Sequence, residues 1–383
     1  MQTVYPYIYG LLQRLKRERL KEMTTLGILQ LDTSEYNPYL NGVASLCAEN
    51  GYDIFRFSPL DVDREHGLVQ RGLQYNSYTN KWLDATFPIP KYIYDRCFYS
   101  SKDKSSYHAI SIVNEIKQMS TFLGIGLPNK WAVHQWLKRN EHLSPYLMPT
   151  QLLNRSTFQS YLNFFQDLVL KPISSSGGKG IYFIFKKEDG SHCLTDASNK
   201  LVTILSDKEP YTQVQSILLK DNYIIQPYKN LKRENRPFDY RIVLQKGETN
   251  WYIVGKGFRV GKENTNVSNI HSGGSVQKTM PFSKREKNHI NKQIGDILPR
   301  IPEQLEKHHS PLFELGVDLG IDERNKLWIL EINSKPGYQT VLRTTGKTVW
   351  RRIFSGPKNR IEKLEKNLDR SDLHDGSSNR LYK

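Results

Sequence analysis

The sequence contains little cysteine and lacks a long hydrophobic run. Its three cysteines, Cys47, Cys97 and Cys193, are far apart and odd in number, so they predict neither a disulfide framework nor a zinc site. No segment approaches the ~20 consecutive apolar residues that a membrane-spanning helix needs. The N-terminal residues are aromatic and then basic, without the apolar core of a signal peptide. We therefore expect a cytoplasmic protein with no membrane span.

Acidic residues are also in the minority. The 383-residue chain has 39 Asp and Glu against 55 Lys and Arg, a formal net charge of +16. This balance suits a nucleic acid, a polyanionic small ligand or an acidic substrate polymer. A helix-turn-helix, zinc-finger or RNP-like aromatic motif is not visible, so nucleic acid is the least favoured of these partners. The length predicts two or three subdomains.

The first third of the chain alternates between strand and helix patterns. Such alternation predicts a small α/β layer with parallel strands. Residues 10–22 have the pattern of a basic amphipathic helix, and residues 62–90 look polar and irregular. The strand and helix segments, in chain order, are residues 25–31, 40–50, 52–57, 91–98 and 107–123.

A hairpin near the C-terminal end carries oxygen-bearing side chains within apolar strands. Residues 313–332 predict two strands joined by a polar turn. Glu331 and Asn333 are two apart on one strand and face the same side, and the antiparallel partner can bring Asp318 beside them. Burying such carboxylates is costly without a cation or a donor. The three residues suit Mg²⁺ bridging a polyphosphate, and a set of solvated or salt-bridged acids is the alternative.

A loop rich in glycine, serine and lysine joins strands predicted over residues 167–171 and 181–185. Its glycines lack a Cβ, so their N–H groups can turn towards phosphate oxygens, and Lys171 can add a point charge. No helix or GK[ST] sequence follows, so this is not a Walker loop, and an ordinary surface turn is the alternative. The loop residues that we assign to nucleotide binding are Ser175, Ser176, Gly177, Gly178, Lys179 and Gly180.

Two further segments carry candidate nucleotide contacts. Residues 223–228 predict a strand that runs into Pro227, and such a hinge can offer backbone groups to an adenine. We assign Gln226 and Tyr228 to this contact, with an edge strand that ends at a proline as the alternative. Lys130 begins a predicted helix and can supply a second cation, although solvent exposure is the default for a helical lysine.

Two arginines lie in a second predicted hairpin, over residues 238–260. Asp239 and Arg241 alternate with apolar residues and share one face, and Arg259 ends the partner strand. Arginine suits planar, bidentate recognition of a phosphate or a carboxylate. With Asn269 in the following VSNIHSGG segment, these arginines can hold a transferred phosphoryl group and a carboxylate. A structural ion pair between Asp239 and Arg241 is the competing explanation.

The order of these features along the chain resembles that of the ATP-grasp superfamily, over roughly residues 120–340. The spacing of Asp318 and Glu331 and the following sequence EINSKPG are the most specific part of the resemblance. The SNIHSGG segment is similar to one in ligases of the ribosomal-S6-modification type. The runs NKW and FDYRI look most like the YheC/YheD endospore coat-associated family.

That resemblance implies a mixed α+β and α/β fold. Two α+β subdomains of an ATP-grasp domain would clasp ATP, and a small α/β pre-ATP-grasp domain would precede them. The implied segments are a basic N-terminal helix at residues 1–24, the preceding domain at 25–120, the ATP-grasp domain at 121–345 and a charged tail at 346–383.

The resemblance also implies roles for the candidate residues. Mg²⁺, with Mn²⁺ as a substitute, would be held by Asp318, Glu331 and Asn333. The two lysines, Lys130 and Lys171, would meet the phosphates, and the two arginines would stabilise the transferred phosphoryl group. Pro227 stands where related ligases often have Glu, so the acid that binds the ribose is open between Glu234 and Asp239.

By the same resemblance, the protein is an ATP- and Mg²⁺-dependent ligase that joins a carboxylate to an amine through an acylphosphate. Its substrates would be small molecules, peptides or envelope- and spore-related compounds, with spore coat proteins as further partners. A cytoplasmic location or association with the endospore coat is implied. The alternative is a catalytically silent nucleotide-binding structural protein of the coat.

Overall fold

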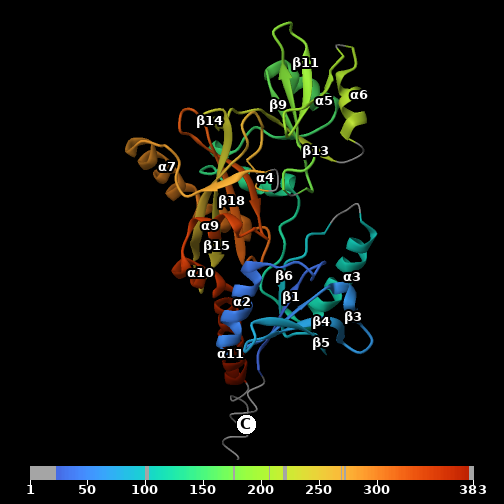
Figure 1. Cartoon of the computed structure of the whole chain (residues 1–383), viewed down its shortest axis with the longest axis vertical. Coiled ribbons are helices and arrows are strands. Elements are labelled where there is room, and N and C mark those ends of the chain that lie inside the picture. Colours follow the sequence, from blue (N-terminus) through green and yellow to red (C-terminus); the bar gives the residue numbers. More distant parts are fainter. Residues whose placement is uncertain are drawn as a thin grey trace, which may run out of the picture. The chain divides into compact units, whose positions relative to one another are not determined.

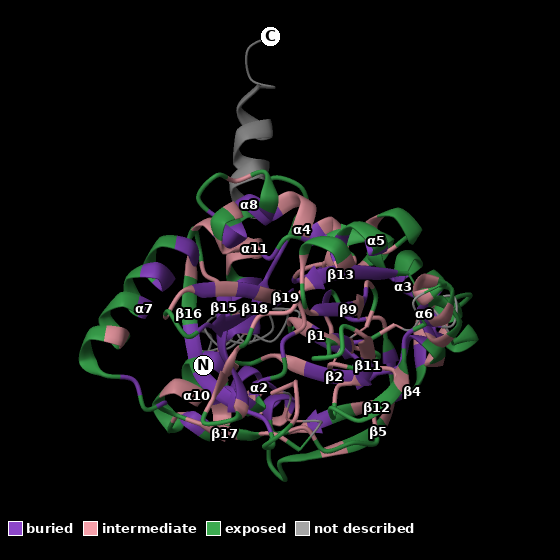
Figure 2. Ribbon diagram, turned by 90° about the horizontal axis from the view of Figure 1, so that it is seen from above, coloured by how far each residue is buried: buried purple, intermediate pink, exposed green. Residues whose placement is uncertain are grey.

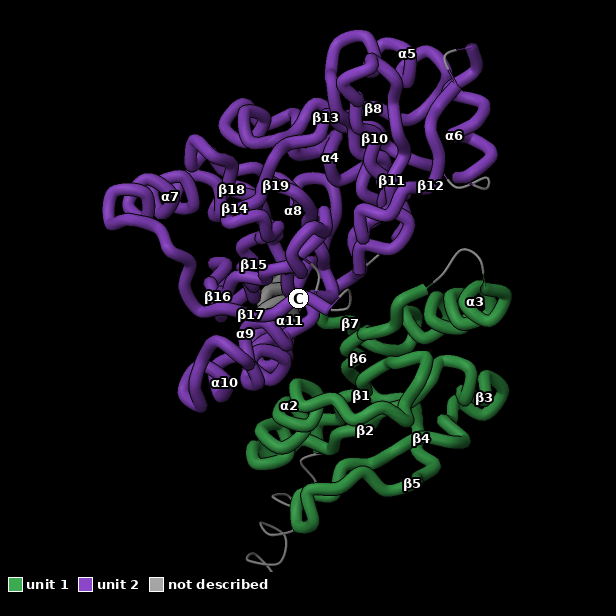
Figure 3. The backbone as a smooth tube through the Cα atoms, turned by 45° about the horizontal axis from the view of Figure 1, so that its top comes forward, with its two compact units in different colours: residues 1–123 green, residues 124–383 purple. Residues whose placement is uncertain are grey.

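The structure is a computed structural model that describes residues 23–99, 103–175, 177–206, 208–218, 222–268, 270 and 273–378, with side chains described as far as residue 367. The chain divides into two compact units, residues 1–123 and 124–383 (Figure 3). The helix predicted over residues 10–22 lies outside the described residues. The finer division into four segments stays a prediction.

The first unit is built on a sheet with strand order β3-β4-β2-β1-β6-β7, and β5 pairs with β4. β1 pairs in parallel with β2 and β6, as the strand–helix–strand pattern predicted. Apolar side chains from the sheet and α3 form its core. The elements are β1 (Thr25–Leu29), α2 (Pro38–Glu49), β2 (Asp53–Phe57), η1 (Pro59–Asp61), β3 (Val62–Asp63), β4 (Leu68–Asn76), β5 (Lys81–Pro88), β6 (Tyr92–Asp95), α3 (Lys104–Met119) and β7 (Thr121–Phe122).

The expectation that residues 62–90 are irregular was wrong. β4 and β5 form an antiparallel hairpin there. Asn76 shapes its turn, because the side-chain oxygen accepts the backbone N–H groups of Tyr78 (3.1 Å) and Thr79 (3.0 Å). β5 alternates over a short run, with Leu83, Ala85 and Phe87 on one face and Asp84 and Thr86 on the other, so the expectation overlooked a strand pattern.

The second unit contains two six-stranded sheets. The first has the strand order β12-β11-β10-β9-β13-β8. α5 and α6 pack on one of its faces, and their apolar residues share a core with the strands (Figure 1). The elements are β8 (Gln151–Leu152), α5 (Arg155–Phe164), β9 (Leu168–Pro172), β10 (Tyr182–Lys186), β11 (His192–Asp196), β12 (Leu201–Ile204), α6 (Pro210–Leu218) and β13 (Tyr223–Pro227).

The second sheet of this unit has the strand order β17-β16-β15-β18-β19, with β14 paired to β15. Its central strands β15 and β18 are buried throughout most of their length (Figure 2). Residues of α4, α7 and α8 join one face of the sheet in the largest apolar core. The elements are α4 (Lys130–Lys138), η2 (Ser144–Tyr146), β14 (Lys232–Arg233), β15 (Arg236–Lys246), β16 (Trp251–Val260), β17 (Ser275–Gln277), α7 (Lys284–Ile297), α8 (Arg300–Glu306), β18 (Glu314–Ile321) and β19 (Leu327–Asn333).

Three helices follow this sheet: α9 (Gln339–Thr344), α10 (Lys347–Phe354) and α11 (Gly356–Ser378). α9 packs on β16 at Gly255 and Gly257, because a Cβ at either glycine would overlap Val341 or Thr344 of the helix. The region predicted as a charged tail therefore contains two helices, α10 and α11, within the residues that the structure describes. No helix in the described part of the chain is long and apolar enough to cross a membrane.

Candidate active site

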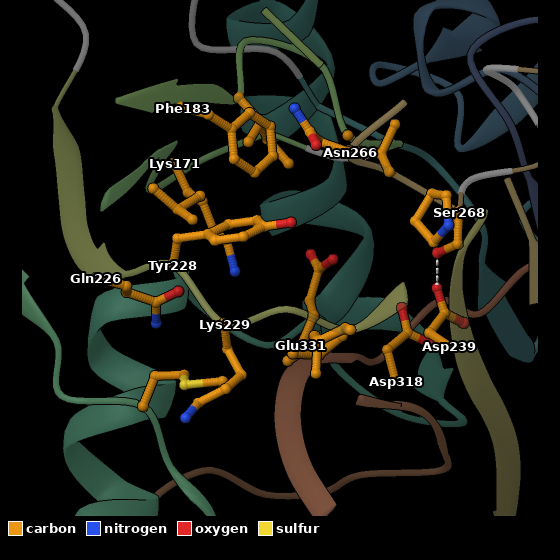
Figure 4. A pocket seen from close by; sticks show the side chains of 18 of the residues that line it. Lys171, Phe183, Gln226, Tyr228, Lys229, Asp239, Asn266, Ser268, Asp318 and Glu331 are labelled. Atoms are coloured by element: carbon orange, nitrogen blue, oxygen red, sulfur yellow. Dashed lines mark hydrogen bonds between the residues drawn. The ribbon is translucent and has the colours of Figure 1, made fainter. Parts of the chain in front are cut away.

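A pocket in the second unit is lined by residues of both of its sheets (Figure 4). β9, β10 and β13 contribute from one sheet, and β15, β16, β18 and β19 contribute from the other. Its empty volume, open mouth included, is about 1040 Å³. A pocket that combines apolar walls with a few polar groups is the usual form of a small-ligand site.

One end of the pocket is apolar and aromatic. Phe183 and Tyr228 meet edge to face there, with ring centroids 5.9 Å apart (Figure 4). Burial, with a contribution from Asp167, raises the pKa of the Tyr228 hydroxyl, which therefore stays neutral. Further apolar residues that line the pocket include Met148, Val169, Ile181 and Leu330. Flat apolar walls of this kind suit a planar base.

The segment that follows β13 runs along this apolar end. Tyr228 donates its backbone N–H to the carbonyl oxygen of Asp167 (2.8 Å), so that donor is occupied. The next backbone N–H, that of Lys229, donates to no other residue among those the structure describes. Gln226 lies in the wall, and its Nε2 donates to Thr150 Oγ1 (2.8 Å). The hinge thus presents a backbone donor and an amide to a ligand.

Two lysines line the middle of the pocket. Lys130 is the first residue of α4, where Asn129 caps the helix through the N–H of Ala132 (3.0 Å). Lys130 Nζ lies 3.2 Å from Glu331 Oε1 and also donates to the carbonyl oxygen of Ser175. Burial lowers the pKa of Lys171 to about 8, with Glu331 opposing the shift and Lys130 adding to it. The two cations therefore share one carboxylate at the centre of the pocket.

Glu331 reaches the pocket through a β-bulge in β19. Asp318 pairs with Glu331, but the next residue of β18, Leu319, pairs with Ile329, so β19 holds one additional residue at this point. A bulge lets two successive residues point to the same side of a sheet. Leu330 and Glu331 accordingly both line the pocket, and Glu331 lies beside Lys130.

The other end of the pocket contains a buried network of alternating charges. The carboxylate of Asp318 accepts hydrogen bonds from two nitrogens of Arg241, Nε and Nη2, and the Nη2–Oδ2 distance is 2.8 Å. Nη2 of Arg259 lies 2.8 Å from the same Oδ2 atom. Arg259 Nε donates to Asp239 Oδ1 (2.7 Å). Ser268 donates its hydroxyl to the other oxygen of Asp239 (Figure 4). Each buried charge therefore faces a charge of opposite sign.

This network shifts the pKa values of its members in different directions. Burial acts to raise the pKa of Asp318, but Arg241 and Arg259 outweigh it and hold that pKa below the ordinary value. Burial raises the pKa of Asp239, with Arg259 and Ser268 opposing the shift and Asp318 adding to it. Burial opposes the charge of Arg259, yet Asp239 and Asp318 raise its pKa, so the guanidinium stays protonated.

The expected alternative of an ion pair between Asp239 and Arg241 was wrong. Strand register decides the pairing: Asp239 lies opposite Arg259 on β16, and Arg241 lies opposite Asp318 on β18. Sequence spacing places two residues on a common face but gives no register between strands. Of the two ribose candidates, Asp239 is engaged in this network. Glu234 lies in the exposed β14–β15 turn and does not line the pocket.

The structure brings together many, but not all, of the residues assigned from the sequence. Those that line the pocket are Lys130, Lys171, Ser175, Gly178, Gln226, Tyr228, Arg259, Asp318 and Glu331. Arg241 is buried behind Asp318, and Asn333 pairs with Gly316 further along β19. Gly177, Lys179 and Gly180 belong to the adjoining loop and are not lining residues. Ser176 and Asn269 lie outside the described residues.

Sequence reasoning missed the apolar lining and Thr150. The lining residues are spread over β9, β10 and β19, where single apolar residues look like ordinary core positions. Thr150 comes two residues after Met148 and next to the short strand β8, which pairs with β13 beside Gln226. No local pattern marks such a contact, because it depends on which strands become neighbours.

The donor set fits a magnesium ion better than a transition metal. In the described part of the chain, no group of three or more His, Cys, Asp and Glu side chains is placed to hold a metal. Asp318 and Glu331 supply two carboxylates from paired strands. Mg²⁺ prefers oxygen ligands, uses few carboxylates, and completes its shell with waters and phosphates.

A family model described as YheC/D like ATP-grasp matches residues 120–359, more than half of the sequence. The chain belongs to this family. The endospore coat-associated protein YheC of Bacillus subtilis (strain 168) is 31% identical over 334 residues, which cover 84% of this chain and 91% of that protein. The resemblance to YheC and YheD inferred from the sequence is thereby confirmed.

Similarity extends to ligases of the wider ATP-grasp superfamily. The tetrahydromethanopterin:alpha-L-glutamate ligase of Methanocaldococcus jannaschii is 26% identical over 82% of this chain and 91% of its own length. The crystal structure of D-alanyl-alanine synthetase A from Vibrio cholerae matches with a TM-score of 0.53 at 10% identity, covering 88% of this chain and 98% of that one. The latter likeness shows the fold alone, and it confirms the predicted ATP-grasp fold. ATP-grasp ligases in general use ATP and Mg²⁺.

Proposed function

We propose that this protein is an ATP- and Mg²⁺-dependent ligase that joins a carboxylate to an amine through an acylphosphate. One observation carries the proposal: Lys130, Lys171 and Arg259 surround Asp318 and Glu331 in a pocket whose other end is apolar. A nucleoside triphosphate needs a flat apolar slot beside concentrated positive charge, and this pocket supplies both. Membership of the YheC/D-like ATP-grasp family supports the same reading.

We place the adenine between the apolar walls near Phe183 and Tyr228, and the phosphates beside the lysines. Lys171 is half-buried, and desolvation lowers its pKa to about 8, so an incoming phosphate gains a partly desolvated cation as its partner. Lys130 is held at the start of α4, and its contact with Glu331 keeps it directed into the pocket. Fixed cations of this kind need little reorganisation when charge develops.

Asp318 and Glu331 are the residues that would hold magnesium, and the assignment of Asn333 as a third ligand stays a prediction. When bound, the magnesium ion would neutralise part of the negative charge on the transferred phosphoryl group. Glu331 would have to exchange its contact with Lys130 for this role. Asp318 would have to release an arginine, which then becomes available to a phosphate oxygen.

The chemistry needs positioning more than covalent catalysis. A substrate carboxylate oxygen attacks the γ-phosphorus, the bond to the β-phosphate oxygen breaks, and ADP leaves. The amine of the second substrate then attacks the acylphosphate carbonyl, inorganic phosphate leaves with the bonding electrons, and the nitrogen loses a proton. Arg259 lines the pocket beside Asp318, so it is the guanidinium available to the transferred group. Arg241 would support Asp318 from behind.

The substrates are proposed as small molecules or peptides that carry a carboxylate and an amine. One relative has a name that states such a chemistry, a glutamate ligase. The relative YheC is named endospore coat-associated, which supports a spore-related substrate, spore coat proteins as partners, and a location in the cytoplasm or at the coat.

A second candidate function is a nucleotide-binding coat protein that has lost its chemistry. The relatives YheC and YheD support it, because both are named as coat-associated proteins rather than as enzymes. The pocket would then bind ATP without turnover. The retention of Lys171, Asp318 and Glu331 in one pocket favours the ligase.

Release of ADP and phosphate separates the two functions. The full chain is incubated with Mg-ATP and panels of amino acids, peptides and amines, beside Glu331→Ala and Glu323→Ala. Glu323 lies exposed in the β18–β19 turn, so its variant is a matched control on the same hairpin. The ligase predicts acceptor-dependent release by the wild type and Glu323→Ala only. Tight ATP binding without release above the Glu331→Ala background, across the panel, contradicts it.

A further inference from the structure

Gln226 lies in the wall of the pocket, where its side chain donates a hydrogen bond to Thr150. Gln226 is 8% exposed, and Thr150, which immediately precedes β8, is 3% exposed. Gln226 Nε2 and Thr150 Oγ1 are 2.8 Å apart. Figure 4 shows the Gln226 amide at the margin of the pocket, with its oxygen on the side of the other lining residues.

A second hydrogen bond decides how this amide is oriented. Thr150 Oγ1 also lies 2.8 Å from the carbonyl oxygen of Met148. A carbonyl oxygen only accepts, so the single hydroxyl proton of Thr150 is directed at Met148. Thr150 is then left as an acceptor towards Gln226, which must present its NH₂ group. If the amide were turned over, two oxygens without a proton between them would lie in contact.

The orientation leaves one amide atom for a ligand. Gln226 Oε1 has no hydrogen-bond partner among the described residues, and it is not sealed from the pocket. The pocket wall therefore contains a fixed hydrogen-bond acceptor beside the apolar slot. An acceptor at this position pairs with an amino group and repels a carbonyl oxygen.

We propose that Thr150 is a positioning residue which, through Gln226, makes this pocket select a 6-aminopurine over a 6-oxopurine. The inference rests on the proposed function in one respect, that the apolar slot receives the base of a nucleoside triphosphate. Adenine has an amino group at its 6-position, whereas hypoxanthine has a carbonyl oxygen there and matches adenine in size. The discrimination is electrostatic rather than steric, because the two bases fill the same slot.

Binding of Mg-ATP and Mg-ITP to the full chain, each measured by calorimetry, tests this inference. The wild type is expected to bind ATP at least tenfold more tightly than ITP. Thr150→Val keeps the shape of the side chain but removes the oxygen that fixes the amide. Gln226 can then turn its NH₂ group towards a 6-oxo group, and the preference for ATP should fall at least fivefold.

Two further variants separate positioning from a merely structural role. Thr150→Ser keeps the hydroxyl and should retain the wild-type ratio of ATP affinity to ITP affinity. Gln226→Met keeps the length of the side chain and loses the acceptor, so its ratio should fall as it does in Thr150→Val. Gln226→Met also tests the inference if Thr150→Val fails to fold. A general loss of protein stability would weaken the binding of ATP and ITP alike and leave the ratio of their affinities unchanged.

The outcomes distinguish this inference from the proposed function. A ratio that falls in Thr150→Val and Gln226→Met but not in Thr150→Ser supports the inference. A wild type that binds ATP, with a ratio unchanged in Gln226→Met, overturns the inference and leaves the nucleotide site in place. Absence of binding of either nucleotide to the folded wild type overturns the proposed function and the inference together.

Discussion

Arg241 and Asp318 face each other across β15 and β18, with Arg241 Nη2 2.8 Å from Asp318 Oδ2 and both residues less than a tenth exposed. Arg259 approaches the same carboxylate oxygen from β16 at 2.8 Å. One buried anion thus compensates two buried cations. The ion pair between Arg241 and Asp318 consequently stabilises the sheet, and it also borders the candidate phosphoryl site.

Removal of that anion should destabilise the protein. Asp318→Ala leaves Arg241 and Arg259 buried, with Asp239 as the remaining carboxylate of the network. We expect a loss of ~3–5 kcal/mol in the free energy of unfolding, the usual cost of breaking a buried ion pair. Urea denaturation measures it, with Glu323→Ala as the control acid on the same hairpin. A loss within the error of that control would show that the arginines find other partners.

Lys171 should make stability depend on pH in the alkaline range. Burial lowers its pKa to about 8 in the folded protein, against 10.5 for an ordinary lysine. Between these values the unfolded chain binds a proton that the folded chain does not, so stability rises with pH across this window. Below it, both states are protonated and the penalty for the buried charge is fully present.

Lys171→Met removes this titration. The free energy of unfolding of the wild type minus that of Lys171→Met should increase from about pH 8 to about pH 10.5. Lys179→Met, on the exposed part of the neighbouring loop, serves as the control. A difference curve for Lys171→Met as flat as that of Lys179→Met would contradict the burial of the ammonium group.

The contact of α9 with β16 should be sensitive to one methyl group. A Cβ at Gly255 would overlap Val341, so Gly255→Ala forces the helix away from the strand. Overpacking of this kind costs ~1–3 kcal/mol. Gly295 in α7 has open space around its Cβ position, and Gly295→Ala should instead stabilise the protein by ~1 kcal/mol or less, because alanine favours the helix. Equal effects of the two substitutions on the unfolding midpoint would refute the close packing.

The face of the sheet towards which each side chain of a single strand points was largely predictable from the sequence. The alternation of Asp239 and Arg241 with apolar residues predicted that both charges share one face, and the hairpin over residues 313–332 predicted that Asp318 and Glu331 share a surface. Both predictions concern one strand or one tight turn, where a period of two fixes the direction of each side chain. The helix start at Lys130, with its Asn129 cap, was predictable for the same local reason.

Contacts between distant strands were not predictable. Arg241 pairs with Asp318 rather than Asp239 because of the register between β15 and β18, which no local pattern gives. The bulge in β19 that lets Leu330 join Glu331 in the pocket is likewise a property of the pairing. Thr150 reaches Gln226 only because β8 and β13 become neighbours.

The nucleotide site is tested by a crystal structure of the full chain with Mg²⁺ and a non-hydrolysable ATP analogue. We predict that the base lies against Tyr228 and Phe183, that the phosphates contact Lys130 and Lys171, and that the metal lies beside Glu331. A nucleotide bound elsewhere, or one whose phosphates lie away from Lys171 and Glu331, would contradict the proposed function.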